Sequence, residues 1–299
     1  MEGNEPFAVL GDRPLNPEPP PRPSYARRIQ RAHDLAAGQP AAAEILNFYA
    51  RLAFHQQHIF QSLGKKGVGA LSGADHAPDR SGATEPAGSW PLEMDLVFPL
   101  FAAFVRFLGE ISPAAMRDRI SSLAASSATQ QVDLLTRFWS GGLREESSDT
   151  FAECFISLAF LQPYAEWLAQ SGHGVPGTES HAVCPVCSSE PVCAVLRDQD
   201  HGARRSLVCS LCMNEWTYRR SLCPACGEHR FESLPVFAAD KIRHVRVDAC
   251  ETCHHYFKTV DMTKDGLAVP VVDELAAVSL DLWAAGNGYK KLLPNLAGL

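Results

Sequence analysis

The sequence of 299 residues contains no apolar run long enough to cross a membrane. Its most apolar stretch, LVFPLFAAFVRFLG, is interrupted by Pro99 and Arg106 and is shorter than the ~20 residues that a membrane-spanning helix requires. We therefore expect a buried helix at this place and no membrane insertion. An apolar content of 46% is typical of a folded, soluble chain.

The chain also lacks the features of an export signal. It begins MEGNEPFAVL, without a basic region or an apolar segment. Arg27 and Arg28 are followed by the polar IQRAHDLAAG, which lacks the apolar segment of a twin-arginine export signal. We expect these arginines to lie on a helix face. We expect a cytoplasmic protein, in a compartment where disulfides are rare.

What the sequence does contain is four CxxC pairs within about 70 residues, a density that is typical of tetrathiolate metal sites. The candidate metal ligands are Cys184, Cys187, Cys209, Cys212, Cys223, Cys226, Cys250 and Cys253. Between successive pairs lie 21, 10 and 23 residues. The two longer spacings suit two CxxC turns, or knuckles, that share one metal ion.

The cysteine region contains a unit of about 40 residues that occurs twice. CPVC followed by CSLC in the first half corresponds to CPAC followed by CETC in the second half. The repeat favours one site from the first and second pairs and another from the third and fourth, with crossed pairing left open. A thioredoxin-like motif is disfavoured, because such a CxxC is normally single and lies in a βαβ pattern.

Other nearby residues have simpler interpretations. Cys154 and Cys193 lie outside any pair, and we expect them to pack as small apolar side chains. His254 and His255 could replace a ligand, but eight cysteines already fill two sites. Four sulfur ligands do not distinguish zinc from iron.

The charge of the chain argues against nucleic-acid binding. Lys and Arg total 27 against 34 Asp and Glu, for a net charge of −7. The cysteine region is close to neutral before any charge on the metal sites is counted, so it lacks the basic face of a nucleic-acid-binding ribbon.

We expect a multidomain α+β protein, with a mostly α-helical N-terminal domain, two tandem rubredoxin-like or zinc-ribbon modules and a C-terminal helix. Six prolines in residues 12–23, six glycines in residues 64–89 and the polar SGHGVPGTES mark an arm, a loop and a linker. The predicted boundaries are an extended arm at 1–23, the helical domain at 24–170, the linker at 171–180, the metal modules at 181–221 and 222–265, and a C-terminal helix with a tail at 266–299.

Apolar residues recur at helical spacing in most of the N-terminal part. The predicted helices cover residues 24–38, 40–63, 92–110, 113–125, 128–140 and 150–170, with a last helix at 270–285. Ser24 is the expected N-cap of the first helix, and Pro163 is expected to kink the sixth. Short runs such as RRSLVC and HVRVDAC predict small hairpins in the modules.

With these motifs in place, the chain resembles the FdhE family of formate dehydrogenase accessory proteins. The matching stretches are CPVCSSEPV, LVCSLCMNEWTYRRSLCPAC, CETCHHYFKTVD, DELAAVSLDLWAAGNGYKK and the early YARRIQRAHDLA. The resemblance covers residues 24–63 and 92–299. One departure is Ser188, which stands where a glycine often follows the knuckle, whereas Gly227 keeps that glycine in the second module.

The resemblance implies a non-enzymatic, cytoplasmic factor that binds the catalytic subunit of a respiratory formate dehydrogenase during its maturation. It also implies iron in both sites, with zinc as the alternative. Two other hypotheses are a rubredoxin-type electron carrier or redox sensor, and a zinc ribbon that binds nucleic acid. Whether the chain acts as a monomer or a homo-oligomer is left open.

Overall fold

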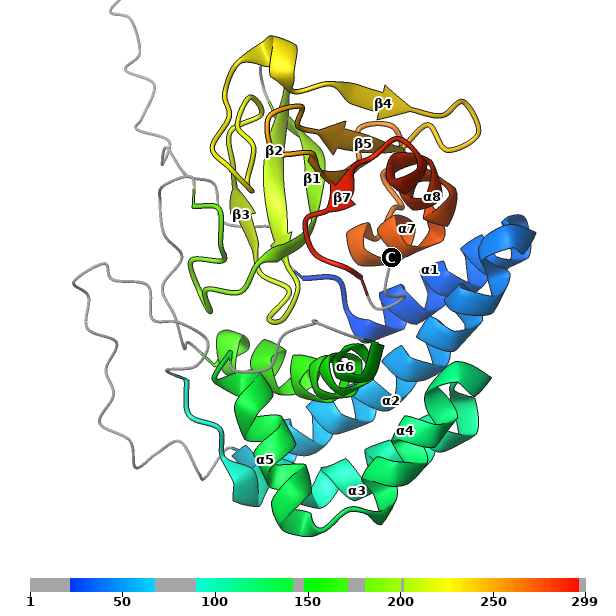
Figure 1. Ribbon diagram of the computed structural model, residues 1–299, viewed down its shortest axis with the longest axis vertical. Coiled ribbons are helices and arrows are strands. Elements are labelled where there is room, and N and C mark those ends of the chain that lie inside the picture. The colour runs from blue at the N-terminus through cyan, green and yellow to red at the C-terminus, as the bar shows by residue number, and fades with distance from the viewer. Residues whose placement is uncertain (1–21, 68–89, 142–147, 172–180, 200–201, 296–299) are drawn as a thin grey trace, which may run out of the picture.

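The computed structural model describes residues 22–67, 90–141, 148–171, 181–199 and 202–295. In these ranges a layer of helices lies against a region that contains a β-sheet and two further helices (Figure 1). This arrangement confirms the predicted α+β class. The predicted arm and linker, and most of the predicted loop at 64–89, lie outside the described residues, so the domain boundaries stay a prediction.

The N-terminal helices lie within a few residues of their predicted ranges. They are α1 (Tyr25–Gly38), α2 (Ala43–Gly67), α3 (Met94–Ile111), α4 (Ala114–Ala125), α5 (Ala128–Trp139) and α6 (Ser148–Gln170). Ser24 is the N-cap of α1 as expected, because its hydroxyl accepts a hydrogen bond from the Arg27 N–H at 3.3 Å. Helix α2 continues past its predicted end at Leu63, since one glycine costs a helix only ~1 kcal/mol.

Helix α6 is buried on more than the one face that its periodicity predicts. Helical spacing puts Phe155 and Leu161 on one apolar face, but Ile156 and Phe160, on other sides of the helix, are each only 1% exposed. The reason is that α6 lies between α2, α3, α4 and α5 on one side and the sheet region on the other (Figure 1). A central helix of this kind is apolar nearly all round.

Buried polar side chains also hold α1 against α6. Arg28 forms a two-pronged ion pair with Glu166, with both nitrogen–oxygen distances at 2.8 Å, and the Tyr25 hydroxyl donates to the same carboxylate at 2.9 Å. Both charged side chains are 2% exposed. Because each buried charge is neutralised and hydrogen-bonded by the other, the pair fixes the orientation of α1 on the helical layer.

The strands of the two predicted metal modules join in one sheet. The strands are β1 (Pro191–Gln199), β2 (Gly202–Cys209), β3 (Glu215–Thr217), β4 (Val236–Ala238), β5 (Val245–Ala249), β6 (His255–Asp261) and β7 (Lys290–Lys291). They run in the order β3-β2-β1-β6-β5-β4, and β7 pairs with β6. The halves meet at the parallel pair β1 and β6, where Ala194 lies opposite Thr259.

The C-terminal segment forms two helices where one was predicted at 270–285. They are α7 (Pro270–Ala276) and α8 (Val278–Gly286), with a break at Ala277, whose φ is −89° and ψ is 42°. The Lys258 ammonium donates to the carbonyls of Glu274 at 2.5 Å and Ala277 at 3.4 Å. Carbonyls that a continuous helix would use internally are therefore satisfied by this buried lysine.

One apolar core extends from the helical layer into the first metal module. It contains Phe160 and Leu168 of α6 together with Cys184, Leu211 and Trp216. A separate cluster joins α1 and α2 to α7, and another joins the second module to α8. Among the described helices, none combines the length and the apolar character needed to traverse a bilayer.

Candidate metal centres

Each CxxC pair lies in a turn that is closed by backbone hydrogen bonds. In every turn the N–H of the first cysteine donates to the carbonyl five residues later, at 2.8 to 2.9 Å. These bonds run from Cys184 to Ser189, from Cys209 to Asn214, from Cys223 to Glu228 and from Cys250 to His255. The shared geometry is the structural form of the repeat that the sequence shows.

The residue after the second cysteine has a left-handed backbone in all four turns. The φ values are 59° at Ser188, 56° at Met213, 76° at Gly227 and 55° at His254. Glycine adopts this conformation freely, whereas other residues lose roughly 1–2 kcal/mol. Ser188 therefore has the same turn geometry as Gly227, and the departure from glycine in the first module does not alter the knuckle.

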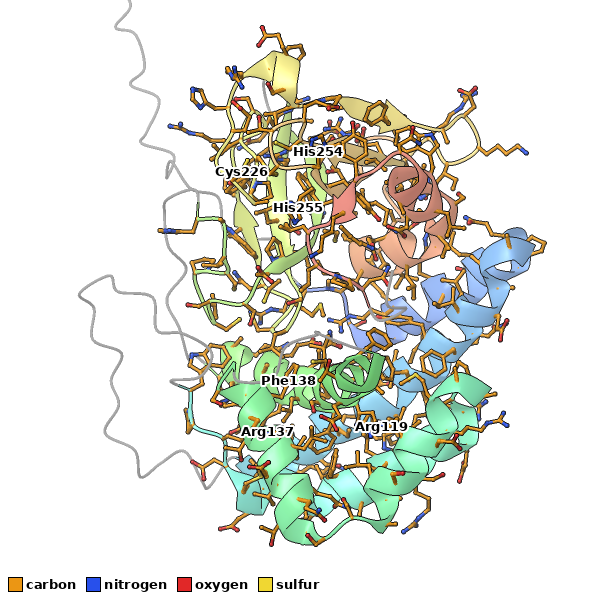
Figure 2. All side chains as sticks on the ribbon, in the orientation of Figure 1. Arg119, Arg137, Phe138, Cys226, His254 and His255 are labelled. Atoms are coloured by element: carbon orange, nitrogen blue, oxygen red, sulfur yellow. The ribbon has the colours of Figure 1, made fainter. Side chains whose placement is uncertain are left out.

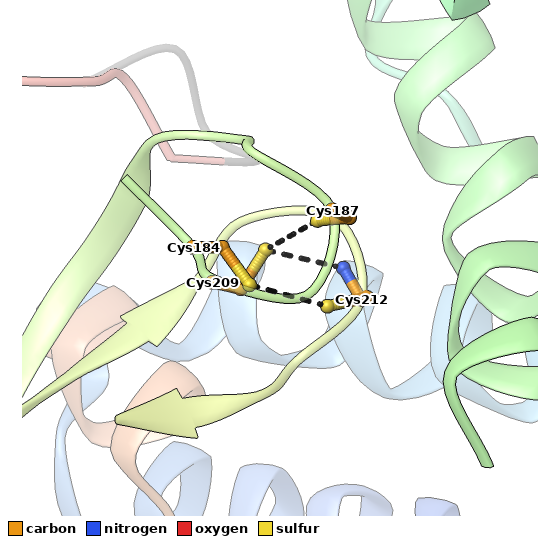
Figure 3. A group of neighbouring side chains, drawn as sticks. All are labelled: Cys184, Cys187, Cys209 and Cys212. Atoms are coloured by element: carbon orange, nitrogen blue, oxygen red, sulfur yellow. Dashed lines mark hydrogen bonds between the residues drawn. The ribbon is translucent and has the colours of Figure 1, made fainter. Parts of the chain in front are cut away.

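The first cluster joins the first and second CxxC pairs (Figure 3). Sulfur–sulfur distances are 3.7 Å between Cys184 and Cys212 and 3.4 Å between Cys187 and Cys209. A metal–sulfur bond of about 2.3 Å implies tetrahedron edges of about 3.8 Å, whereas a disulfide requires about 2.0 Å. The spacing fits a tetrahedral metal site, and all four cysteines are buried.

The second cluster joins the third and fourth pairs in the same way. The sulfur–sulfur distances are 3.8 Å between Cys223 and Cys253 and 3.7 Å between Cys226 and Cys250. Both clusters thus follow the pairing that the repeat favours, and the crossed pairing is not observed. In contrast to the first cluster, Cys226 is exposed and Cys253 is partly exposed.

Backbone amides point at the sulfurs of the first cluster. The N–H of Val186 lies 3.4 Å from the Cys184 sulfur, and the N–H of Leu211 lies 3.3 Å from the Cys209 sulfur. Such donors stabilise thiolates, but burial acts in the opposite direction and raises the pKa of Cys209 and Cys212 well above the ordinary value of a thiol. A bound cation would supply the positive charge that these buried sulfurs need.

The remaining cysteines and the two neighbouring histidines stand apart from the clusters. Cys154 in α6 and Cys193 in β1 are 6% and 1% exposed, and neither belongs to a group of four sulfurs. His254 and His255 also lie outside both groups. The Nδ1 atom of His255 lies 3.0 Å from the carbonyl of Cys253, so this ring contacts the knuckle backbone.

Sequence reasoning missed a third group of possible ligands, His244, Asp265 and Asp273. His244 Nε2 lies 2.8 Å from an oxygen of Asp273, and Arg31 of α1 lies 2.5 Å from both carboxylates. The guanidinium already supplies the positive charge that these acids need. Its members lie between residues 244 and 273 but follow no spacing that is typical of a metal site, so no motif marked the group.

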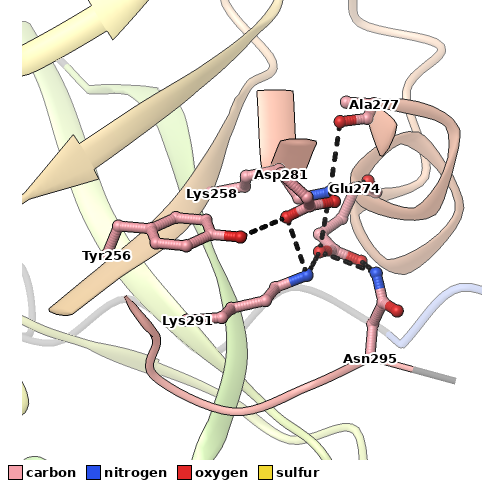
Figure 4. Close-up of polar contacts among 7 residues, drawn as sticks. All are labelled: Tyr256, Lys258, Glu274, Ala277, Asp281, Lys291 and Asn295. Carbon is pink, nitrogen blue, oxygen red and sulfur yellow. Dashed lines mark hydrogen bonds and ion pairs between the residues drawn. The ribbon is translucent and has the colours of Figure 1, made fainter. Parts of the chain in front are cut away.

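A buried network of lysines and carboxylates was also missed (Figure 4). The Lys258 ammonium lies 3.0 Å from Glu274 and 2.5 Å from Asp281. The Lys291 ammonium lies 2.6 Å from Glu274 and 3.1 Å from Asp281. The sequence offers Glu274 only a favourable place near a helix N-terminus. The structure adds that this carboxylate ties α7 to β6 and to the C-terminal tail.

The donor set of each cluster could hold one metal ion. Four sulfur atoms at tetrahedral spacing suit zinc and iron alike, so the geometry does not decide between them. An ion with four cysteine ligands has no open coordination position for a substrate. The clusters are therefore suited to stabilising structure or to electron transfer, and poorly suited to metal-assisted hydrolysis.

Two family models match the C-terminal part of the chain. The model described as FdhE, central domain, matches residues 183–220, and the model described as FdhE, C-terminal domain, matches residues 219–297. The first covers the first cluster, and the second covers the second cluster with α7, α8 and β7.

Relatives match the chain over most of its length. The protein FdhE homolog of Aquifex aeolicus is 28% identical over 263 residues, which are 87% of this chain and 90% of the relative. The protein FdhE homolog of Pseudomonas aeruginosa is 28% identical over 293 residues, 93% of this chain and 90% of the relative.

A solved structure agrees with these matches. The crystal structure of the FdhE protein from Pseudomonas aeruginosa superposes with a TM-score of 0.66 at 26% identity, and covers 93% of this chain and 97% of that protein. The helices, the sheet with its two four-cysteine clusters and the sequence matches all agree. The chain is therefore similar to FdhE proteins in sequence over most of its length and in fold.

Proposed function

We propose that this protein is a non-enzymatic, cytoplasmic accessory factor in the maturation of a respiratory formate dehydrogenase. In this proposal it binds the catalytic subunit of the dehydrogenase through a platform with two tetracysteine metal sites. The observation that carries the proposal is the pair of four-sulfur clusters on one sheet, in a chain that is similar to FdhE proteins over most of its length.

The eight cysteines act as the metal ligands in this proposal. Iron is the proposed ion in both sites, on the resemblance to the family, with zinc as the alternative. With Fe(III) each site would carry a net charge of −1, and with a divalent ion −2. Such sites hold the knuckles rigid, because a small metal module rests more on its ion than on a large core.

Capture of the client tests the proposal. A tagged version of the intact chain should retain the catalytic subunit when it is isolated anaerobically from cells that make the dehydrogenase. Substitution Cys187→Ser should reduce the capture, because it removes a ligand from the first site. Cys154→Ser is the matched control, since that thiol lies in α6 outside both clusters. Absence of the subunit from the intact chain's eluate would overturn the proposal.

A rubredoxin-type electron carrier or redox sensor is the second candidate. The exposure of Cys226 favours it, because electron transfer requires a site near the surface. Anaerobically purified protein with the absorption spectrum of a ferric tetrathiolate and reversible reduction would support this role. Protein that contains only zinc would exclude it, since zinc has no accessible second oxidation state.

A further inference from the structure

The surroundings of the two clusters differ more than their sequences do. All four cysteines of the first cluster are buried, and Cys184 and Cys212 belong to the apolar core that continues into α6. The Gln162 amide of α6 also donates to the carbonyl of Ser210, inside the second knuckle, at 2.7 Å. The helical layer therefore covers this cluster and holds one of its turns.

The second cluster lies away from the helical layer. Figure 2 places Cys226, His254 and His255 in the sheet region, whereas Phe138 of α5 lies in the helical layer below it. Cys226 is exposed and Cys253 is partly exposed, and neither belongs to the core that covers the first cluster. Solvent thus reaches one cysteine of this cluster freely and a second cysteine in part.

A surface pocket also borders the second cluster. Its lining includes Cys223 and Cys250, the two cysteines that are otherwise buried, together with Arg205, Arg220 and Arg246. Asp248 lines the same pocket, 3.8 Å from Arg205 and 2.9 Å from Arg246, so three guanidinium groups face one carboxylate. The remaining positive charge offsets the negative charge of a metal-bound tetrathiolate and favours the approach of an anionic chelating ligand.

We propose that the second cluster is an exchangeable metal centre, whereas the first is permanent. An entering ligand with carboxylate or thiolate donors binds the ion as the exposed Cys226 leaves it, Cys253 follows, and the chelator's further donors then replace the two buried cysteines. The ion departs with the chelator, and the freed thiolates take up protons from solvent. At the first cluster the same step requires the helical layer to open, which adds a free-energy barrier. This proposal rests on the metal binding in the proposed function.

Metal release is the first test. The full chain is loaded with two zinc ions and mixed with excess of a chromophoric pyridylazo chelator. We expect two phases of one ion each, with rates that differ by about tenfold or more, because a difference of about 1.4 kcal/mol in local opening free energy already changes the open population tenfold. Release of both ions at one rate would overturn the proposal.

Thiol labelling identifies which site empties first. Iodoacetamide forms a carbon–sulfur bond with each accessible thiolate as iodide leaves, and peptide mass spectrometry locates the label. During the fast phase the label should appear on Cys226 and Cys253, with Cys184 and Cys187 unlabelled. Early label in the first cluster would overturn the proposal. This measurement uses the unaltered chain, so it does not depend on whether a cysteine variant folds.

A pair of variants assigns the phases directly. Cys226→Ser should abolish the fast phase and leave one slowly released ion, whereas Cys187→Ser should remove the slow phase or prevent folding. If Cys226→Ser lost the slow phase instead, the assignment of the two phases to the two clusters would be wrong. A chain that binds no metal would refute the proposed metal sites themselves, and failure to capture the dehydrogenase subunit would leave the inequality of the clusters intact.

Discussion

At the residue scale, the four knuckles share one backbone conformation but differ in how well their residues suit it. Gly227 adopts a positive φ without steric cost, and no atom lies within 4 Å of the place where a Cβ would stand. His254 occupies the same position in the fourth turn with a side chain. The hydrogen bonds of the turn hold it in this disfavoured region.

This difference predicts opposite effects of two substitutions. His254→Gly should raise the free energy of unfolding by about 1 kcal/mol, because glycine adopts the left-handed backbone conformation without the steric cost that a Cβ atom brings. Gly227→Ala should lower it by about 1 kcal/mol for the same reason. Denaturant unfolding of both variants at equal metal content checks the prediction. A change of the same sign in both variants would show that the turn backbone is not what decides stability here.

The residue scale is also where the sequence was most informative. The spacing within each CxxC pair reflects a local turn, and the repeat favoured the observed grouping, but only the structure decided against crossed pairing. The roles of Asp273 and Glu274 did not follow, because their partners Arg31, Lys258 and Lys291 lie on other elements and no spacing rule pairs them with these acids. A buried carboxylate looks like any other acidic residue until the cations opposite it are known.

At the element scale, a chain of buried amides links the helical layer to the first cluster. The Gln56 amide of α2 donates to the carbonyl of Ala159 at 2.7 Å and to the Gln162 side chain at 3.0 Å. Gln162 of α6 in turn donates to the carbonyl of Ser210 at 2.7 Å. Because these groups are shielded from water, each depends on its partner.

Gln162→Leu should therefore destabilise the protein by about 1–3 kcal/mol, since it leaves the Ser210 carbonyl and the Gln56 amide with fewer partners. It should also accelerate zinc release from the first cluster. Gln30→Ala, on the exposed face of α1, is the control and should change stability by less than about 0.5 kcal/mol. Urea unfolding measures both. Equal stability of Gln162→Leu and the unaltered chain would contradict the role assigned to this amide.

At the element scale, the periodicity of apolar residues predicts where helices lie but not how they are buried or where they break. The helical spacing located α1 to α6 correctly, but it could not show that α6 is central and buried on several sides. The same limit applies to the segment at 270–285, where a good helical pattern is interrupted at Ala277. The interruption depends on Lys258 in β6, a residue that the local pattern does not contain.

At the scale of the whole molecule, the buried charge network joins the sheet, α7, α8 and the C-terminal tail. Burial raises the pKa of Glu274, but Lys258 and Lys291 outweigh this effect and hold the pKa below its ordinary value of 4.5. A carboxylate with a lowered pKa contributes stability above the pKa of the unfolded chain. That stability is lost as the pH falls through the folded-state pKa.

Lys291→Met tests the network through its pH dependence. At pH 7 the variant should lose about 3–5 kcal/mol, because Glu274 keeps its charge with one ammonium partner fewer. The difference from the unaltered chain should shrink as the pH falls toward 4 and Glu274 takes up a proton. Lys290→Met is the adjacent control, since that side chain is exposed. Unfolding at matched metal content measures the effect, and a difference independent of pH would argue against a charge on Glu274.

The sequence by itself determined the helical segments, the apolar character of the core helices and the four CxxC pairs, and it favoured their division into two sites. These features depend on spacings of a few residues or on a repeat within the chain. The tertiary structure decided that both modules share one sheet, that one cluster is covered and the other exposed, and that paired charges lie buried. Each of these depends on contacts between distant segments, and local spacing does not specify which distant surfaces meet.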